Sequence, residues 1–301
     1  MKLSSLKEAG ISSRGDAYFL TLSKNLLLLD KGLEIIREFE NNNIDYLVLK
    51  GLYLAFSAYP DAGLRSMADI DLLIKREDLD KVDIVLARLG YIESSAKAQR
   101  VYGCDATFSG KDATSVDIHW NLCQYERFKG VINITQDFWS RAQEYSLNGA
   151  KVRSLCAEDH ILYVALHYAL VHVFSLPNGA YDLSYLLNDN KLDWGKIINN
   201  ASKYGIKTTL YYGLLKASQL NPLMLPDFVL RRLKPNFLKR KLLDWLLKHN
   251  SRAGRYLCQS LFVDNLFDSF KVLCRLVKAA RTRYNKINPA IFSDTPTAIR
   301  V

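Results

Sequence analysis

Two aspartates two residues apart are the first candidates for chemistry in this sequence. Asp69 and Asp71 lie in the run 69–74, where apolar residues accompany the acids. If this run is a strand, the spacing of two puts both carboxylates on one face, close together. Two half-buried carboxylates repel each other and are costly to bury unless a cation lies between them. The pair therefore predicts a cation site.

A third acid and a lysine-glycine pair extend this predicted site. Asp117 lies in the run 116–120, and a strand there could lie beside the first one. Three carboxylates from two neighbouring strands would form an oxygen-rich cup that suits Mg²⁺. Lys50 and Gly51 lie where a strand turns into a helix, and the N–H groups of such a helix start favour phosphate. Arg65 could supply a second positive charge to the phosphate.

Each of these features alone also has an ordinary explanation. An Asp-x-Asp pair can belong to a solvated strand edge, and Asp117 can be a hydrogen-bonded turn acid. Lys50 and Gly51 can form a simple turn. An acid on a strand marks an active site only with some probability, but the order of these features and their strand context favour one shared site.

The elements that must position these residues follow from the spacing of apolar residues. Steps of three and four predict helices, and short apolar runs predict strands. The predicted order is a helix at 16–41, a strand at 45–49, a helix-like run that follows it up to residue 59, a strand at 69–74, a helix at 79–89, and an antiparallel pair of strands at 101–108 and 115–120. We expect an N-terminal helix region at 1–42 that packs on the core, followed by an α/β domain at 43–150.

The rest of the chain, 151–301, is expected to form a helical domain. Helical spacing occurs at 161–171, 181–188, 194–204, 207–219, 236–249 and 264–284. The fold class is therefore α+β: a small mixed sheet with flanking helices, followed by a mainly helical C-terminal half. His160 and His167 share one helix face, and His172 follows. Core histidines with hydrogen-bond partners are the simpler interpretation, because a metal site would need a third ligand.

Charge is distributed unevenly over the 301 residues. The formal net charge is +10, and residues 231–301 hold 16 Lys or Arg against 4 Asp or Glu, a net of +12. The last predicted helices therefore carry the basic excess, which indicates either a polyanionic partner or an ordinary solvated face. The composition, 49% hydrophobic and 24% charged, excludes a disordered chain, a collagen and a disulfide knot.

The cysteines and the apolar segments indicate in which compartment of the cell the protein is expected. Five scattered cysteines without a CxxC pair predict reduced thiols rather than disulfides or a zinc ribbon. Residues 1–10 lack the apolar core of a signal peptide. The longest uncharged stretch, 161–178, contains two histidines and predicts a buried helix rather than a membrane span, which needs about 20 mainly apolar residues. We expect a cytoplasmic protein without a transmembrane segment.

Several runs of this sequence together resemble a known family. They lie at 46–51, 59–60, 64–74, 89–91, 116–120, 157–162 and 166–167. In this order they resemble the uncharacterised bacterial nucleotidyltransferase family called type 5, in the DNA-polymerase-β-like nucleotidyltransferase superfamily. The resemblance covers about 45–190. Where the wider superfamily usually has Gly-Gly or Gly-Ser, this chain has Lys50-Gly51, and the separation of Gly51 from Asp69 exceeds that of minimal members.

The resemblance implies nucleotidyl transfer from an NTP with two metal ions. It assigns Asp69 and Asp71 as paired metal ligands and Asp117 as the third catalytic carboxylate. The nucleotide-binding set is then Lys50, Gly51, Arg65 and Ser66. A possible acceptor site contains His167 and Asp182, although Asp182 could equally cap a helix.

Three hypotheses of different class follow. The leading one is an Mg²⁺-dependent transferase that moves NMP from an NTP to an acceptor hydroxyl and releases pyrophosphate. The acceptor could instead be RNA, as in a tRNA-modifying or toxin-like enzyme, and steep salt dependence of RNA binding would indicate this. The third is a non-catalytic module that binds nucleotide or RNA, for which NTP binding without turnover would be the sign.

Overall fold

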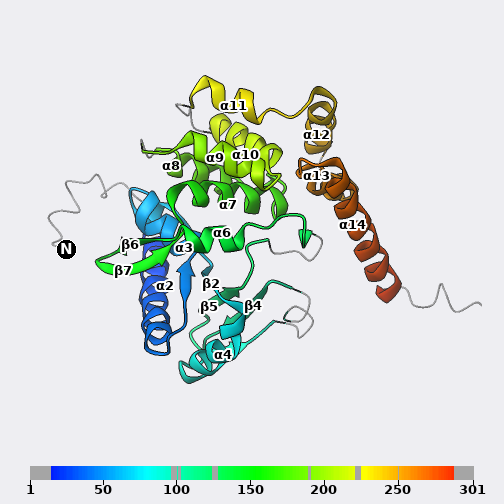
Figure 1. Cartoon of the computed structure of the whole chain (residues 1–301). Coiled ribbons are helices and arrows are strands. Elements are labelled where there is room, and N and C mark those ends of the chain that lie inside the picture. The colour runs from blue at the N-terminus through cyan, green and yellow to red at the C-terminus, as the bar shows by residue number, and fades with distance from the viewer. Residues whose placement is uncertain are drawn as a thin grey trace, which may run out of the picture.

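The computed structural model of the chain describes residues 15–95, 100, 103–123, 128–188, 191–220, 225–249 and 251–287, with the backbone alone at 252 and 279–287. Figure 1 shows the sheet with its long N-terminal helix on one side and a stack of later helices beside it. The last helices lead away from the sheet, and α14 extends furthest from it.

Seven strands form one mixed sheet in the order β3-β4-β5-β2-β1-β7-β6. They are β1 (Tyr46–Val48), β2 (Asp69–Ile74), β3 (Ile92–Glu93), β4 (Asp105–Ser109), β5 (Ser115–His119), β6 (Gln143–Leu147) and β7 (Ala150–Ser154). The parallel neighbours β2 and β5 lie at the centre, and β1 is antiparallel to β2 on its other side. Because side chains alternate along a strand, Ile70 points to one face of β2, and Asp69 and Asp71 point to the other.

The helix α2 (Asp16–Asn41) covers the apolar face of the sheet. It approaches so closely at Gly32 that a Cβ there would lie 2.6 Å from Leu52 Cδ1 and 3.7 Å from Ile70 Cγ2. The helix α4 (Leu79–Arg88) packs against α2. Burial of Ile70 under α2 leaves the carboxylates of β2 on the opposite face of the sheet.

The remaining helices include one short helix after β1, which also contacts α2, and the helices that follow β5 and β7. They are α3 (Lys50–Tyr53) with the π-helix Leu54–Ala58, α6 (Thr135–Ser140), α7 (Ala157–Leu170), α8 (Asn178–Leu186), α9 (Trp194–Lys203), α10 (Lys207–Leu220), α11 (Asp227–Leu233), α12 (Phe237–His249), α13 (Arg252–Leu261) and α14 (Leu266–Ile287). The helices α7, α8 and α10 pack against one another. Nearly every residue of α7 is buried, so this helix is the core of the helical half.

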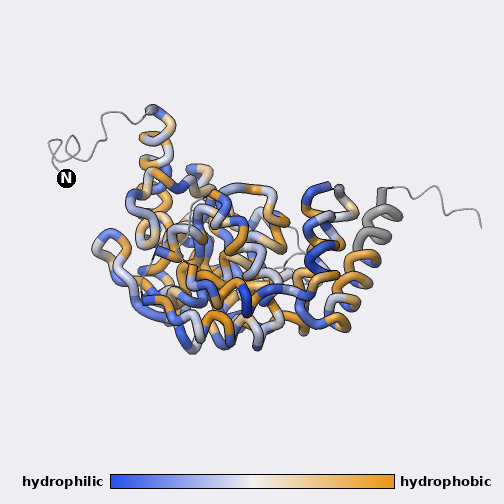
Figure 2. Tube along the Cα trace, turned by 90° about the horizontal axis from the view of Figure 1, so that it is seen from above, coloured by the Kyte–Doolittle hydropathy of each residue, from blue (hydrophilic) through white to orange (hydrophobic). Residues whose placement is uncertain are grey.

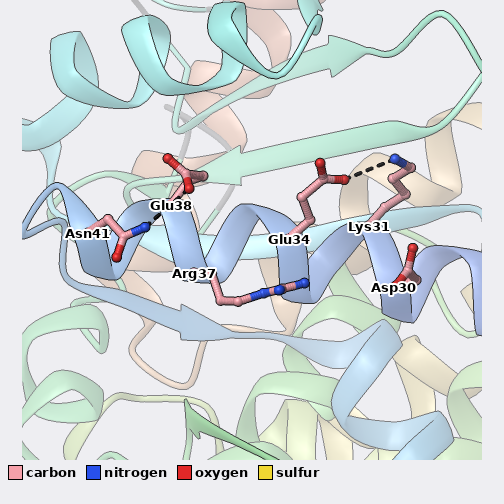
Figure 3. A pocket seen from close by; sticks show the side chains of 6 residues that line it. All are labelled: Asp30, Lys31, Glu34, Arg37, Glu38 and Asn41. Atoms are coloured by element: carbon pink, nitrogen blue, oxygen red, sulfur yellow. Dashed lines mark hydrogen bonds and ion pairs between the residues drawn. The ribbon is translucent and has the colours of Figure 1, made fainter.

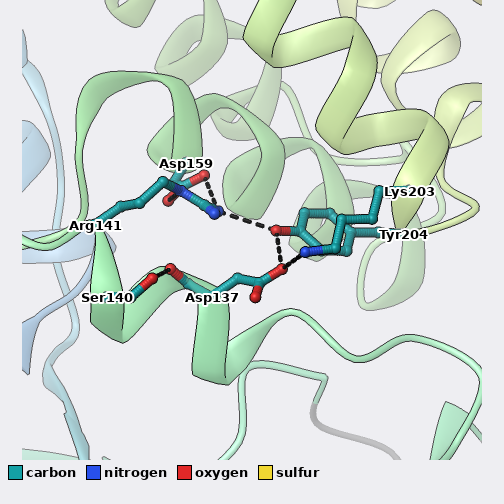
Figure 4. Close-up of polar contacts among 6 residues, drawn as sticks. All are labelled: Asp137, Ser140, Arg141, Asp159, Lys203 and Tyr204. Carbon is teal, nitrogen blue, oxygen red and sulfur yellow. Dashed lines mark hydrogen bonds and ion pairs between the residues drawn. The ribbon is translucent and has the colours of Figure 1, made fainter.

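A polar network joins the region after α6 to α7 and α9 (Figure 4). Arg141 donates hydrogen bonds of 2.8 and 2.9 Å to the fully buried carboxylate of Asp159 and a third, of 3.0 Å, to the Tyr204 hydroxyl. Tyr204 in turn donates to Asp137 over 2.7 Å. Because Asp159 is buried, its bidentate partner is what makes the charge tolerable there.

The structure confirms the α+β class, the mixed sheet and the mainly helical second half. The helix predicted at 16–41 has those bounds, and the antiparallel pair is β4 and β5, although residues 101 and 102 of the first predicted strand lie outside the described residues. No described helix is long and apolar enough to cross a bilayer.

Strands β3, β6 and β7 and helices α6, α11 and α13 were not predicted. The β6 strand is mostly polar and exposed, so period-two hydrophobicity does not mark it. A signal did exist in the turn, because Asn148 and Gly149 have φ of 50° and 88°, and Asn-Gly favours a two-residue hairpin. Since β7 pairs with β1, the sheet continues as far as Ser154.

Candidate active site

The register of β2 and β5 brings two of the predicted acids side by side. Asp71 lies directly opposite Asp117, and Asp69 lies opposite Ser115. His119, two residues beyond Asp117, lies on the same face and donates to or accepts from Asp71 Oδ1 over 2.9 Å. The expectation that the two acidic strands are neighbours is therefore correct.

Three side chains of this face form a group that could hold a metal ion. The ligand atoms of Asp71, Asp117 and His119 all lie within 4.8 Å of one another. The buried Oδ1 of Asp117 has no hydrogen-bond partner among the described residues. A buried carboxylate oxygen without a donor is costly, and a cation would satisfy it. The donor set therefore fits a divalent ion, with Asp69 one pleat further along β2.

The electrostatics of the three carboxyl groups differ. Burial alone would raise the pKa of Asp71, but the Lys50 charge and the His119 hydrogen bond hold it well below its usual range. Burial and the neighbouring Asp71 charge raise the pKa of Asp69 to about 6. Burial also raises the pKa of Asp117, and a hydrogen bond with Thr107 offsets part of this rise by lowering the pKa. The charged forms of Asp69 and Asp117 are therefore disfavoured without a cation, and a bound cation would lower the pKa of both groups.

This pKa difference predicts a pH-dependent effect of metal. The folded chain without a cation holds the Asp69 proton more tightly than the unfolded chain, so its stability falls as pH rises from about 4 through about 6. Bound cation reverses this, because it requires the ionised form. We expect Mn²⁺ or Mg²⁺ to raise the melting temperature more at about pH 8 than at about pH 5, measured by scanning calorimetry. In Asp69→Asn the rise should be small and nearly independent of pH. An equal or larger rise at the lower pH in the unsubstituted chain would contradict this assignment.

Lys50 lies against the acids rather than in open solvent. Its Nζ lies 3.3 Å from Asp71 Oδ1 and 5.9 Å from the centre of the Tyr163 ring. Burial would lower the pKa of this ammonium, but the Asp71 charge raises it above its ordinary value. Lys50 thus stays protonated and supplies the positive charge nearest the candidate metal ligands.

The other predicted nucleotide-binding residues have different surroundings. A Cβ on Gly51 would lie in ordinary contact with Asp69 O and Met67 Sδ, both 3.4 Å away. Ser66 is exposed in the loop before β2. Arg65 Nη1 lies 3.9 Å from that same Gly51 Cβ position, so the guanidinium reaches the Lys50-Gly51 turn.

Arg65 also joins the sheet to the helical half. Its Nε and Nη2 donate to the Asp182 carboxylate over 2.8 and 2.9 Å, and the Tyr59 hydroxyl donates to the same group over 2.8 Å. Asp182 lies inside α8 and is 6% exposed, so it is not a helix cap. Two residues that were predicted for separate subsites, nucleotide and acceptor, therefore form one ion pair.

The histidines of α7 separate into a core residue and a site residue. His160 is fully buried, bonds Ser154 Oγ over 3.0 Å and stacks on Tyr53 at 3.6 Å, and burial lowers its pKa to about 3. The charges of Lys50 and Asp71 instead act on the pKa of His167, in opposite directions. Burial, then Lys50, lower the pKa of His167 well below its usual value, so the ring is neutral at pH 7.

Two residues of this site were not singled out from the sequence. His119 follows Asp117 by two, the same spacing that related Asp69 to Asp71, so the signal was present. Tyr163 lies one helical turn from His167, and its buried hydroxyl has no hydrogen-bond partner among the described residues. This hydroxyl lies near Lys50 and is a further candidate for contact with a ligand.

A separate hollow lies along the outer side of α2 (Figure 3). Its lining residues are Asp30, Lys31, Glu34, Arg37, Glu38 and Asn41. They are all exposed or half-buried, with charges of both signs. Because α2 covers the sheet face opposite the carboxylates, this hollow is not part of the acidic site.

A model of the family described as uncharacterised nucleotidyltransferase matches residues 15–222. The chain belongs to this family. It is thus an enzyme of the nucleotidyltransferase class, and the resemblance seen in its motifs is confirmed. The match spans the sheet and the helices α7 to α10, whereas α11 to α14 lie beyond it.

Three solved structures are similar to this nucleotidyltransferase at low sequence identity. The lincosamide antibiotic adenylyltransferase LnuA with lincomycin bound is 17% identical, covers 52% of this chain and 96% of its own, and has a TM-score of 0.37. The antibiotic-resistance factor ANT(2'')-Ia is 16% identical over 61% of this chain and 92% of its own, with a TM-score of 0.44. A nucleotidyltransferase-like antigen of Paracoccidioides brasiliensis is 14% identical over 70% and 91%, with a TM-score of 0.41. No curated protein matches the chain.

Proposed function

We propose that the chain transfers a nucleoside monophosphate from an NTP to an acceptor hydroxyl. The acceptor oxygen would bond to the α-phosphorus, the bond to the bridging oxygen of the β-phosphate would break, and pyrophosphate would leave. The observation that carries this proposal is the pairing of Asp71 with Asp117 on adjacent parallel strands, where a buried carboxylate oxygen lacks a donor.

Asp69, Asp71 and Asp117 would hold two Mg²⁺ ions, with the Nε2 of His119 fixing the orientation of Asp71. When bound, such ions stabilise the charge that develops on the transferring and leaving phosphates. The raised pKa of Asp69 and of Asp117 supports this role, because their carboxylates are destabilised until a cation is present.

Lys50, Gly51, Arg65 and Ser66 would bind the triphosphate. The Lys50 ammonium lies next to the acids, where a phosphate bridged by metal would meet it. Asp182 holds the Arg65 fork in place through Nε and Nη2 while Nη1 reaches the Lys50-Gly51 turn. In this arrangement Asp182 supports the nucleotide site instead of touching the acceptor.

His167 would face the acceptor. Its neutral ring can accept a hydrogen bond from the acceptor hydroxyl and so orient it, whereas burial and the Lys50 charge, which lower its pKa, make it a weak base. Asp117, whose pKa is raised, is then the candidate proton acceptor.

Lys50→Ala should weaken binding of Mg-ATP or Mg-GTP at least about tenfold, because charge-assisted hydrogen bonds to phosphate are among the strong ones. Isothermal titration calorimetry measures this. Lys75→Ala is the matched control, since Lys75 is an exposed lysine that pairs with Asp45 at the far end of β2. Unchanged affinity for both nucleotides in Lys50→Ala would place the phosphates elsewhere.

The transfer itself is tested with α-labelled NTPs. The protein is incubated with each NTP and Mg²⁺, in one arm with protein-free small molecules from cells and in another with total RNA. Label should move to a small molecule when the intact site is present. Label on RNA alone would replace this acceptor by RNA, and nucleotide binding with no transfer in either arm would favour a non-catalytic module.

A further inference from the structure

The basic residues of the C-terminal helices do not all lie on one exposed face. Residues 231–301 carry a net charge of +12, and α12, α13 and α14 lie at the side of the molecule away from the sheet (Figure 1). Lys239, however, points inward, where its Nζ donates to Val263 O over 2.7 Å and burial lowers its pKa. The consecutive basic residues Lys239, Arg240 and Lys241 therefore do not form one exposed cluster.

The helix α12 instead exposes an apolar stripe. Its inner face buries Lys239, Leu243 and Leu246. Leu238, Leu242 and Trp245, spaced by four and three, share another face and are 79%, 46% and 57% exposed. We call these three residues the α12 stripe.

The helix α14 repeats this arrangement. Val272 and Leu276 are buried, whereas Leu266, Phe270 and Val277 are 75%, 62% and 59% exposed. Their spacings of four and seven place them on one side of the helix. Figure 2 shows hydrophobic turns recurring along this helix. We call these three residues the α14 stripe.

Lysines border the α12 stripe. Lys241 and Lys248 are exposed and lie three or four residues from stripe residues, and so beside them on the helix surface. A helix surface that combines leucine and large aromatic side chains with flanking lysines is typical of a helix that lies in a membrane interface. Isolated exposed apolar residues are common, but two such stripes, on two helices that both pack against α13, point to a partner.

We propose that the α12 and α14 stripes dock on the surface of a membrane that contains anionic lipids. The aliphatic side chains would enter the boundary between headgroups and acyl chains, while the lysines would contact the lipid phosphates. The charge of the segment favours this partner over a second copy of the chain, because two segments of net charge +12 repel each other. The aliphatic residues favour it over RNA, because phosphates and stacked bases give Leu238 and Leu266 nothing apolar to enter.

Co-sedimentation with vesicles tests this proposal independently of transfer. The full chain should bind vesicles of phosphatidylcholine with about 30% phosphatidylglycerol at least about tenfold more tightly than vesicles of phosphatidylcholine alone. Leu242→Glu with Trp245→Glu should weaken binding at least about tenfold. Lys241→Gln with Lys248→Gln should weaken binding to the anionic vesicles only. Ile84→Glu, a change at an exposed apolar residue of α4, is the matched control and should bind like the unsubstituted chain.

Three results would overturn the proposal. One is equal binding of the anionic vesicles by the stripe variant and the control, with circular dichroism showing that both are folded. Another is concentration-dependent dimerisation in sedimentation velocity that Trp245→Glu abolishes, without vesicle binding. The last is salt-sensitive binding of total tRNA by a chain that binds neither the anionic vesicles nor those of phosphatidylcholine alone.

Discussion

Asp71→Asn is expected to lower nucleotidyl transfer by at least about 1,000-fold, because the amide would remove the central negative charge of the proposed metal site. The amide has the shape of the carboxylate, and it can still hydrogen-bond His119, so the fold should survive. The measurement is the rate of label transfer from an α-labelled NTP, with the melting temperature recorded on the same preparation. Asp69→Asn and Asp117→Asn should act in the same direction.

Asp45→Asn is the control for this prediction. Asp45 is an exposed acid that pairs with Lys75, far from the Asp71 and Asp117 pair. Its replacement should leave the transfer rate within about twofold, because surface ion pairs contribute little. A transfer rate in Asp71→Asn similar to that of Asp45→Asn would exclude Asp71 from the chemistry.

Arg65→Met should lower the free energy of unfolding by about 3–5 kcal/mol, because it would leave the Asp182 charge buried without its partner. The side chains of Arg65 and Asp182 are 14% and 8% exposed, so water screens the remaining charge poorly. Unfolding in urea measures the loss. Since the pair joins the loop before β2 to α8, the loss should also appear as weaker cooperativity between the two halves.

The double variant Arg65→Met/Asp182→Leu separates the two roles of Arg65. Most of the lost stability should return, because no unpaired charge stays buried. If the double variant instead loses the sum of the unfolding free energies that the two single substitutions lose, the unpaired Asp182 charge is not the cause of the instability of Arg65→Met. Nucleotide affinity in the stable double variant then reports on phosphate contact: a fall of at least about tenfold supports it, and unchanged affinity makes Arg65 a structural residue.

Local patterns in the sequence predicted the part of the site that depends on strand geometry. The spacing of Asp69 and Asp71 predicted a common face, and the apolar runs around Asp71 and Asp117 predicted two strands that could lie side by side. His119 lies two residues beyond Asp117 on the same strand, so the same alternation places it on the face of the acids. Period and spacing suffice here because a strand imposes a regular alternation.

Contacts between distant segments could not be predicted in this way. The partner of Arg65 is 117 residues away, and no local pattern distinguishes its guanidinium from one that faces phosphate. Lys239 looked like its exposed neighbours, although packing of α12 against the α13 region turns it toward Val263 O. The hairpin of β6 and β7 was missed for another reason. The strand β6 is mostly polar and exposed and lacks the apolar alternation on which strand prediction rests, and β7 has Val152 as its one large buried apolar side chain.

The most direct test of the account is to locate the metal. Crystals grown with Mn²⁺ and a non-hydrolysable NTP analogue would reveal the ion by its anomalous scattering. We expect an anomalous peak between the carboxylates of Asp71 and Asp117, with the triphosphate beside Lys50. A triphosphate bound elsewhere, or bound here with no peak between these two carboxylates, would contradict it.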